Sequence, residues 1–177
     1  MVIEAPISNP PQAYLDIILP LIGTARGIVE GGESLVPAAF VGNLTTQKTL
    51  PVMLNSKSEE TKDESAAVIK HAAAAIDADF VFLVMEAWSL RPDKLHRYEQ
   101  ILEKYGSIGD SPYAIDIVSM ALETRHGVWV AQLPLKPKGH SKKKRTFGQP
   151  DFRFFTEVKG RFVDLLPSKD GGPQTLH

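Results

Sequence analysis

The longest run of apolar residues in the chain is Phe80-Val-Phe-Leu-Val-Met85. Asp79 precedes this run and Glu86 follows it, so polar residues mark both of its ends. A short continuous apolar run with such boundaries is typical of a β-strand that is covered on both faces. We therefore expect residues 80–85 to form a strand at the centre of a sheet.

A first helix is predicted over residues 14–29. Apolar residues recur there at spacings of three and four, which is the period of a helix with one buried face. Pro20 falls inside the pattern. Because proline lacks an N–H and clashes with the preceding turn, we expect the helix to kink or to begin afresh at this residue. Gly31 and Gly32 follow as a helix stop.

A second helix is predicted to begin at Ser56, which forms a capping-box pattern with Glu59. Acidic residues crowd its first turns, where the positive end of the helix dipole favours them. Five apolar residues are expected on the inner face of this helix: Val68, Ile69, Ala72, Ala73 and Ile76.

A short third helix is predicted over residues 91–105, which have helical composition and precede a loop at 106–112. Four apolar residues are expected on one side of it: Leu95, Tyr98, Ile101 and Leu102.

Two short apolar runs between the first two helices predict a β-hairpin. They cover residues 35–41 and 49–54, with a polar turn at 43–48 between them. Each run contains a proline, Pro37 or Pro51. Since proline cannot donate a hydrogen bond to a neighbouring strand, we expect at least one of these strands at a sheet edge, or prolines that face away from the pairing partner.

Four extended stretches after residue 113 predict further strands, at residues 114–124, 128–135, 152–158 and 161–166. Arg125-His126-Gly127 predicts a tight hairpin loop, and Lys159-Gly160 predicts a two-residue turn. The second half of the sheet should therefore be antiparallel.

The expected fold is an α+β domain over residues 1–167. It has a mostly antiparallel sheet of six or seven strands, with two or three helices packed against it. Residues 168–177 contain Gly171, Gly172 and Pro173 and are expected to form a flexible tail.

The composition excludes several classes of function. The chain contains no Cys, so disulfides, thiolate metal sites and a cysteine nucleophile are excluded. Glycine-rich phosphate-binding motifs are absent, and the five histidines show no metal-ligand spacing. We therefore expect neither a cofactor nor a metal.

The sequence shows no sign of a membrane partner. The first eleven residues differ from a secretory signal, and no apolar run approaches the ~20 residues of a membrane helix. We therefore expect a soluble, cytoplasmic protein.

Residues 136–150 concentrate positive charge. Six basic residues occur there within ten positions, with no acidic residue among them: Lys136, Lys138, Lys142, Lys143, Lys144 and Arg145. The rest of the chain has 14 basic residues, six fewer than the total of 20, against 21 acidic ones. Since this segment consists of proline, glycine, serine, histidine and six basic residues among few apolar ones, it cannot build a core, and we expect a solvated loop, either exposed or disordered.

The basic segment predicts a polyanionic partner. Lysine and arginine clusters attract phosphates through Coulomb forces and counterion release. The residues predicted to bind are Lys138, Lys142, Lys143, Lys144 and Arg145, with Phe147 available to stack on a base.

Glu86 and Trp88 predict a second kind of site. Glu86 directly follows the central strand and Trp88 lies two positions on, so both side chains are expected on one face. A carboxylate beside an indole in an apolar cleft suits acid–base work, with His71 as a helper, or the binding of a cationic ligand. In the alternative, structural interpretation, Glu86 pairs with an arginine such as Arg91 or caps the following helix, and Trp88 closes the core.

Asp116 interrupts the apolar pattern of the strand predicted at 114–124. Its burial would be costly unless a charge on a neighbouring strand paired with it, for which Arg125 and Arg153 are candidates. If one face of that strand is solvated, Asp116 needs no partner.

Two functional hypotheses follow. The first is a non-enzymatic binding protein that contacts nucleic acid, another polyanion or an acidic protein surface through the basic segment. The second is a small hydrolase-like enzyme with a cleft around Glu86 and Trp88. Steep salt dependence of binding would favour the first, and a pocket that holds both residues and a histidine would favour the second.

Overall fold

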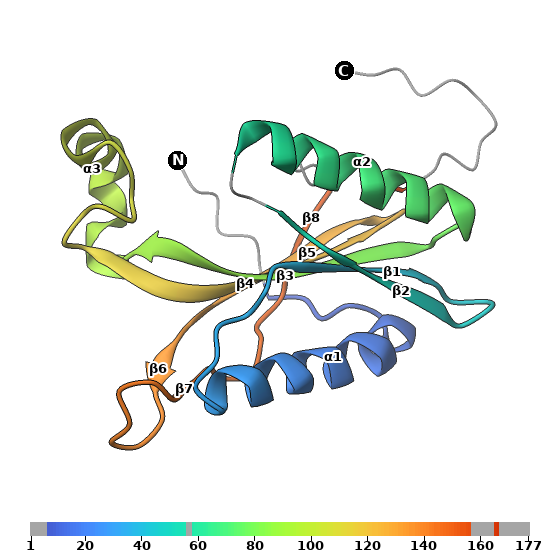
Figure 1. Ribbon diagram of the computed structural model, residues 1–177, viewed down its shortest axis with the longest axis horizontal. Coiled ribbons are helices and arrows are strands. Elements are labelled where there is room, and N and C mark those ends of the chain that lie inside the picture. The colour runs from blue at the N-terminus through green and yellow to red at the C-terminus, as the bar shows by residue number, and fades with distance from the viewer. Residues whose placement is uncertain (1–6, 56–57, 157–164, 167–177) are drawn as a thin grey trace.

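The computed structural model describes residues 7–55, 58–156 and 165–166 (Figure 1). Within them, six strands form one antiparallel sheet in the order β2-β1-β3-β4-β5-β8, and two short strands form a second sheet. The strands are β1 (Ala38–Asn43), β2 (Lys48–Met53), β3 (Phe80–Leu90), β4 (Ala114–Thr124), β5 (Gly127–Pro134), β6 (Lys136–Pro137), β7 (Arg145–Thr146) and β8 (Arg153–Phe155). The helices are α1 (Gln12–Glu30), α2 (Glu59–Ala75), the 3₁₀ helix η1 (Pro92–Arg97) and α3 (Tyr98–Tyr105). The expected α+β class with a six-stranded antiparallel sheet is confirmed.

β3 lies inside the sheet, between β1 and β4. Alternate residues of a strand point to opposite faces. Phe80, Phe82 and Val84 accordingly pack in the core under α1, whereas Val81 and Leu83 pack in the core under α2. Figure 1 shows the two helices on opposite faces of the sheet. The predicted central strand is therefore confirmed, and its double coverage explains its continuous apolar sequence.

α1 is one continuous helix that includes Pro20 and ends just before Gly31. The expected new start at Pro20 is wrong. Pro20 lies on the exposed side of α1, so the carbonyl oxygen that its missing N–H leaves unpaired faces water. The helix therefore continues past this residue.

β1 and β2 form the predicted hairpin. Pro51 lies in β2, which is the edge strand, and Pro37 precedes β1. The expectation that proline would confine at least one of these strands to an edge is confirmed.

Ser58 caps the start of α2. Its hydroxyl accepts a hydrogen bond from the Thr61 N–H (3.1 Å), and the Thr61 hydroxyl accepts one from the Ser58 N–H (2.9 Å). The capping box predicted at Ser56 and Glu59 is therefore misplaced by two residues. Thr61 supplies the oxygen that the prediction assigned to a glutamate.

The inner face of α2 differs from the prediction at Val68. Ile69 and Ala73 are fully buried, while Ala72 and Ile76 are partly buried. Val68 is exposed. Consecutive helical residues point about 100° apart, and here Ile69 faces the sheet whereas Val68 points away from it.

β3 and β4 continue beyond β1 and β5 as a two-stranded ribbon, which we define as residues 88–90 paired with 114–116. η1 and α3 connect its strands at the far end (Figure 1). The helix predicted over 91–105 is thus divided into two. Of the four residues expected on its one apolar side, only Ile101 is buried. Since α3 lies beyond the two helical layers, the other three remain exposed: Leu95, Tyr98 and Leu102.

β4 and β5 form the predicted hairpin. Thr124 pairs with Gly127, so the loop consists of Arg125 and His126, and Gly127 adopts a positive φ of 141°.

The C-terminal predictions hold only in part. β8 covers only part of the strand predicted at 152–158, and Leu165 and Leu166 are not in a strand. The turn at 159–160 and the tail at 168–177 lie outside the described residues.

Candidate functional site

The basic segment forms an ordered hairpin, which we call the basic arm (residues 136–146). In it, Lys136 pairs with Thr146 and Pro137 with Arg145. The Lys138 N–H donates to the Lys144 carbonyl (2.9 Å), which closes the loop. Gly139 allows the turn because it adopts the left-handed conformation, with φ of 64°. The segment is thus an exposed loop on two short strands.

Glu86 anchors the foot of the basic arm. Its Oε1 lies 2.7 Å from Arg145 Nη1, and its Oε2 accepts a hydrogen bond from the Leu35 N–H. The side chains of Arg145 and Glu86 are only 23% and 22% exposed. Glu86 therefore joins three segments, namely β3, β7 and the chain that enters β1.

The partner of Glu86 is thus an arginine, as the structural interpretation held, but not the one suggested. Arg91 pairs instead with Asp93 at 2.9 Å. The Asp93 carboxylate raises the pKa of Arg91, and Arg91 lowers the pKa of Asp93.

Phe147 belongs to the core under α1 and is 3% exposed. The Arg26 guanidinium lies over its ring, 4.7 Å from the centroid. Arg26 also donates hydrogen bonds to the carbonyls of Phe147 (3.1 Å) and Gly148 (3.0 Å). The prediction that this ring stacks on a base is therefore wrong, because α1 covers it. The same contacts fix the C-terminal end of the basic arm.

The basic arm also contacts the C-terminal end of α1. Lys138 Nζ lies 3.2 Å from Glu30 Oε1, and the Thr146 hydroxyl contacts the same oxygen at 3.5 Å. A Cβ placed on Gly32 would lie 3.6 Å from the Cβ of Lys143. The negative end of the α1 dipole favours lysines at this position.

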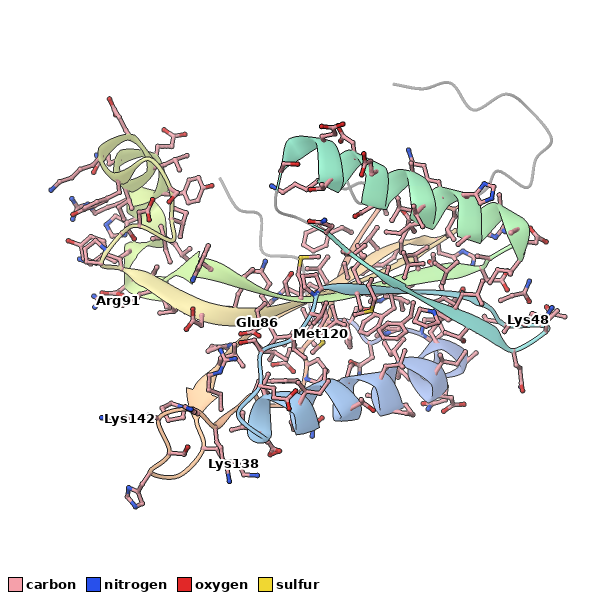
Figure 2. All side chains as sticks on the ribbon, viewed as in Figure 1. Lys48, Glu86, Arg91, Met120, Lys138 and Lys142 are labelled. Atoms are coloured by element: carbon pink, nitrogen blue, oxygen red, sulfur yellow. The ribbon has the colours of Figure 1, made fainter. Side chains whose placement is uncertain are left out.

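Lys142, Lys143 and Lys144 are exposed, and none of them forms an ion pair within the described residues. The Ser141 hydroxyl accepts hydrogen bonds from the N–H groups of Lys143 (3.3 Å) and Lys144 (3.1 Å), which orders the loop around them. Figure 2 shows Lys138 and Lys142 on the basic arm, which projects away from the sheet. Three adjacent ammonium groups thus face solvent on an ordered support.

Trp88 lies in the ribbon and is 65% exposed, so it does not close the core. A Cβ on Gly109 would lie 2.7 Å from the indole, which shows that the ring rests against the Gly109 backbone. Asp116 is directly opposite Trp88 in β4 and is also exposed. Asp116 is solvated because it lies near the end of β4, whereas Val118, Met120 and Leu122 on the same face are buried under α1, so the strand does not have one solvated face. Asp116 forms no ion pair in the described part of the chain, and Arg125 lies near Asp77 and Asp79 instead.

The residues of the hydrolase hypothesis are not brought together. Glu86 points to the face of the sheet that α1 covers, as the alternation along β3 requires, whereas His71 is an exposed residue of α2 on the other face. Both carboxylate oxygens of Glu86 are engaged with Arg145 and Leu35.

An open depression of about 520 Å³ lies between the β1–β2 turn and the end of α2. It is lined by residues 74–77 together with Asn43, Thr45, Thr46 and Lys48. Lys48 is at the opposite end of the molecule from Lys142 (Figure 2). The depression is therefore separate from the basic arm.

The sequence reasoning missed a buried carboxylate, Glu123. It is 8% exposed, and it accepts hydrogen bonds from the N–H groups of Leu165 and Leu166 at 2.9 to 3.1 Å. An available signal was its place in β4, where the alternation from Ala121 puts it on the face under α2. Its contacts indicate a structural role in fixing the C-terminal segment.

Among the described residues, no three potential metal ligands of the His, Asp or Glu type lie close enough to hold an ion. None of the described helices combines the length and the hydrophobicity needed to cross a bilayer. Comparison with known proteins found no match to the chain among family models, curated proteins or solved structures.

Proposed function

We propose that the protein is a non-enzymatic binding protein that contacts polyanions through the basic arm. The observation that carries this proposal is that some basic side chains of the arm form ion pairs within the protein, whereas others remain free to bind a partner. Arg145 and Lys138 are paired with Glu86 and Glu30, which fixes the arm, while the side chains of Lys142–Lys144 remain exposed. Because the arm is already ordered, binding costs less conformational entropy than the ordering of a flexible loop would.

The charge of the rest of the molecule supports this orientation. Outside the six basic residues of the arm, the chain has 14 basic and 21 acidic residues, so the net charge of the body is negative. Such a body repels a polyanion, whereas the arm attracts it. The partner is therefore steered to Lys142–Lys144. The cytoplasmic location expected from the sequence is part of the proposal.

The proposal gives Glu86 a structural role. Its two oxygens hold Arg145 and the Leu35 N–H, and His71 lies across the sheet. No observation on this face favours the hydrolase alternative over binding.

A charge-matched pair of variants tests the proposal. Replacing Lys142, Lys143 and Lys144 by Gln should weaken binding of a labelled oligonucleotide about tenfold or more at low salt, because three phosphate contacts are lost. The control replaces three exposed lysines on other elements by Gln: Lys48, Lys70 and Lys104. Both variants carry three fewer positive charges, so total charge cannot explain a difference between them.

Fluorescence anisotropy titrations measure the affinities, and thermal melting shows that both variants fold. Exposed charges contribute little to stability, so the melting temperatures should stay within a few degrees of the wild type. Equal loss of affinity in both variants would contradict the assignment to the arm. Wild-type protein that binds neither nucleic acid nor heparin at low salt would overturn the proposed function.

A further inference from the structure

The exposed indole of Trp88 lies close to the start of the basic arm. Trp88 is opposite Asp116 in β4, and the Leu135 N–H donates to the Asp116 carbonyl (2.9 Å). Since neighbouring strands are about 4.8 Å apart, the chain enters the arm about 10 Å from the Trp88 backbone. Lys136 is the next residue.

The arm and the indole lie on the same face of the sheet. Glu86 and Trp88 are two residues apart in β3, so their side chains point to one face, about 7 Å apart along the strand. Glu86 holds Arg145 of the arm on that face. Figure 2 shows Glu86 at the junction from which the arm and the ribbon diverge.

The charges on this face differ between the basic arm, which is positive, and the surroundings of Trp88, which include an exposed carboxylate. Glu86 is paired with Arg145, and Lys142–Lys144 extend from the arm. Asp116 places an exposed carboxylate beside Trp88. A phosphate is therefore favoured on the arm and disfavoured at the indole, where an uncharged aromatic group fits better.

The indole of Trp88 is large and lies outside both apolar cores. The ring rests against the Gly109 backbone, and most of the surface of Trp88 remains in water. Aromatic rings in this situation provide stacking platforms for unpaired bases in proteins that bind single strands.

We propose that the polyanion is a single-stranded nucleic acid, with one base stacked on Trp88 and the adjoining phosphates on Lys142–Lys144. This inference rests on the proposed function and specifies its partner. A duplex keeps its bases stacked inside and offers no internal base face to the indole. Heparin has charge but no base. Both polymers therefore use the arm alone.

Substitution of Trp88 separates stacking from charge. Trp88→Ala should weaken binding of a single-stranded oligonucleotide about tenfold to a hundredfold, the range found when a stacking aromatic residue is removed. It should leave the affinity for heparin and for a duplex of equal length unchanged. Trp88→Phe should retain most of the single-strand affinity because it keeps an aromatic face. Because Trp88 is exposed, both variants should melt like the wild type.

Intrinsic fluorescence provides an independent measurement. The chain has two tryptophans, and Trp129 is 6% exposed. A stacked base should quench Trp88, so the wild type should lose fluorescence on binding and Trp88→Phe should not.

The outcomes separate the two proposals. If the protein binds heparin, duplex and single strand equally and Trp88→Ala changes none of them, the stacking inference is wrong while the binding function stands. If binding requires an acidic protein instead of a nucleic acid, the inference is wrong as well. If no polyanion binds, both fail.

Discussion

At the scale of single residues, Glu86 is one of the contacts that hold the basic arm in place. Removing its charge leaves Arg145 without a partner in a site of which about a quarter is exposed. We expect Glu86→Gln to lower the free energy of unfolding by about 1 to 2 kcal/mol, less than for a fully buried pair. Trypsin should also cleave after Lys142–Lys144 faster than in the wild type. The control is Asp116→Asn, which removes an exposed carboxylate of the same face. Equal behaviour of the two variants in urea unfolding and proteolysis would refute the anchoring role.

Tyr14 gives a residue-scale prediction on pH. Burial raises its pKa above the ordinary value of 10.0, with a further contribution from the charge of Asp79. Above pH 10 the unfolded chain therefore loses the tyrosine proton more readily than the folded chain, so stability is full below that pH and falls as the pH rises through the folded pKa. Between about pH 9 and about pH 11 the urea midpoint of Tyr14→Phe should fall less than that of the wild type. A matched variant, Tyr98→Phe, removes an exposed hydroxyl on α3. Identical pH dependence of wild type and Tyr14→Phe would contradict this account.

At the scale of elements, α2 shows how far periodicity alone determines a buried face. Its alanine-rich sequence left Val68 and Ile69 as the two large candidates, and the structure buries only Ile69. We expect Ile69→Asp to unfold the protein, because the carboxylate would enter the core between α2 and the sheet. Val68→Asp should remain folded, since that side chain is in water. Circular dichroism melting of both variants decides the matter. A cooperative, near-wild-type melt of Ile69→Asp would show that α2 does not pack as described.

The elements that could be predicted are those specified by local sequence. The apolar run at 80–85, the helical period of α1 and the glycine of the β4–β5 loop each determine their own segment. The hairpin conformation of the basic arm could not be predicted from its local sequence. It depends on Glu86, Glu30 and Arg26, which are far away in the sequence and are brought to the arm by the packing of α1 and β3. The exposure of the three lysines could be predicted because it follows from their own charge. The burial of Phe147 could not be predicted because it depends on packing against α1, which is distant in the sequence.

At the scale of the whole molecule, the surface proposed to bind lies outside the apolar cores. Two apolar cores on either side of the sheet hold the protein together, and the arm and the ribbon extend from one end of it. Variants of Lys142–Lys144 and of Trp88 should therefore change binding without changing the fold.

The salt dependence of oligonucleotide binding reports how many phosphates the protein contacts. Each contact with a single strand contributes about 0.7 to the slope of log K against log salt concentration. For a labelled single strand, the slope of the wild type should be about −2 or steeper. With Lys142, Lys143 and Lys144 replaced by Gln it should be shallower by about 2. Equal slopes in the two proteins would show that these lysines do not contact phosphates, and would contradict the function proposed for the basic arm.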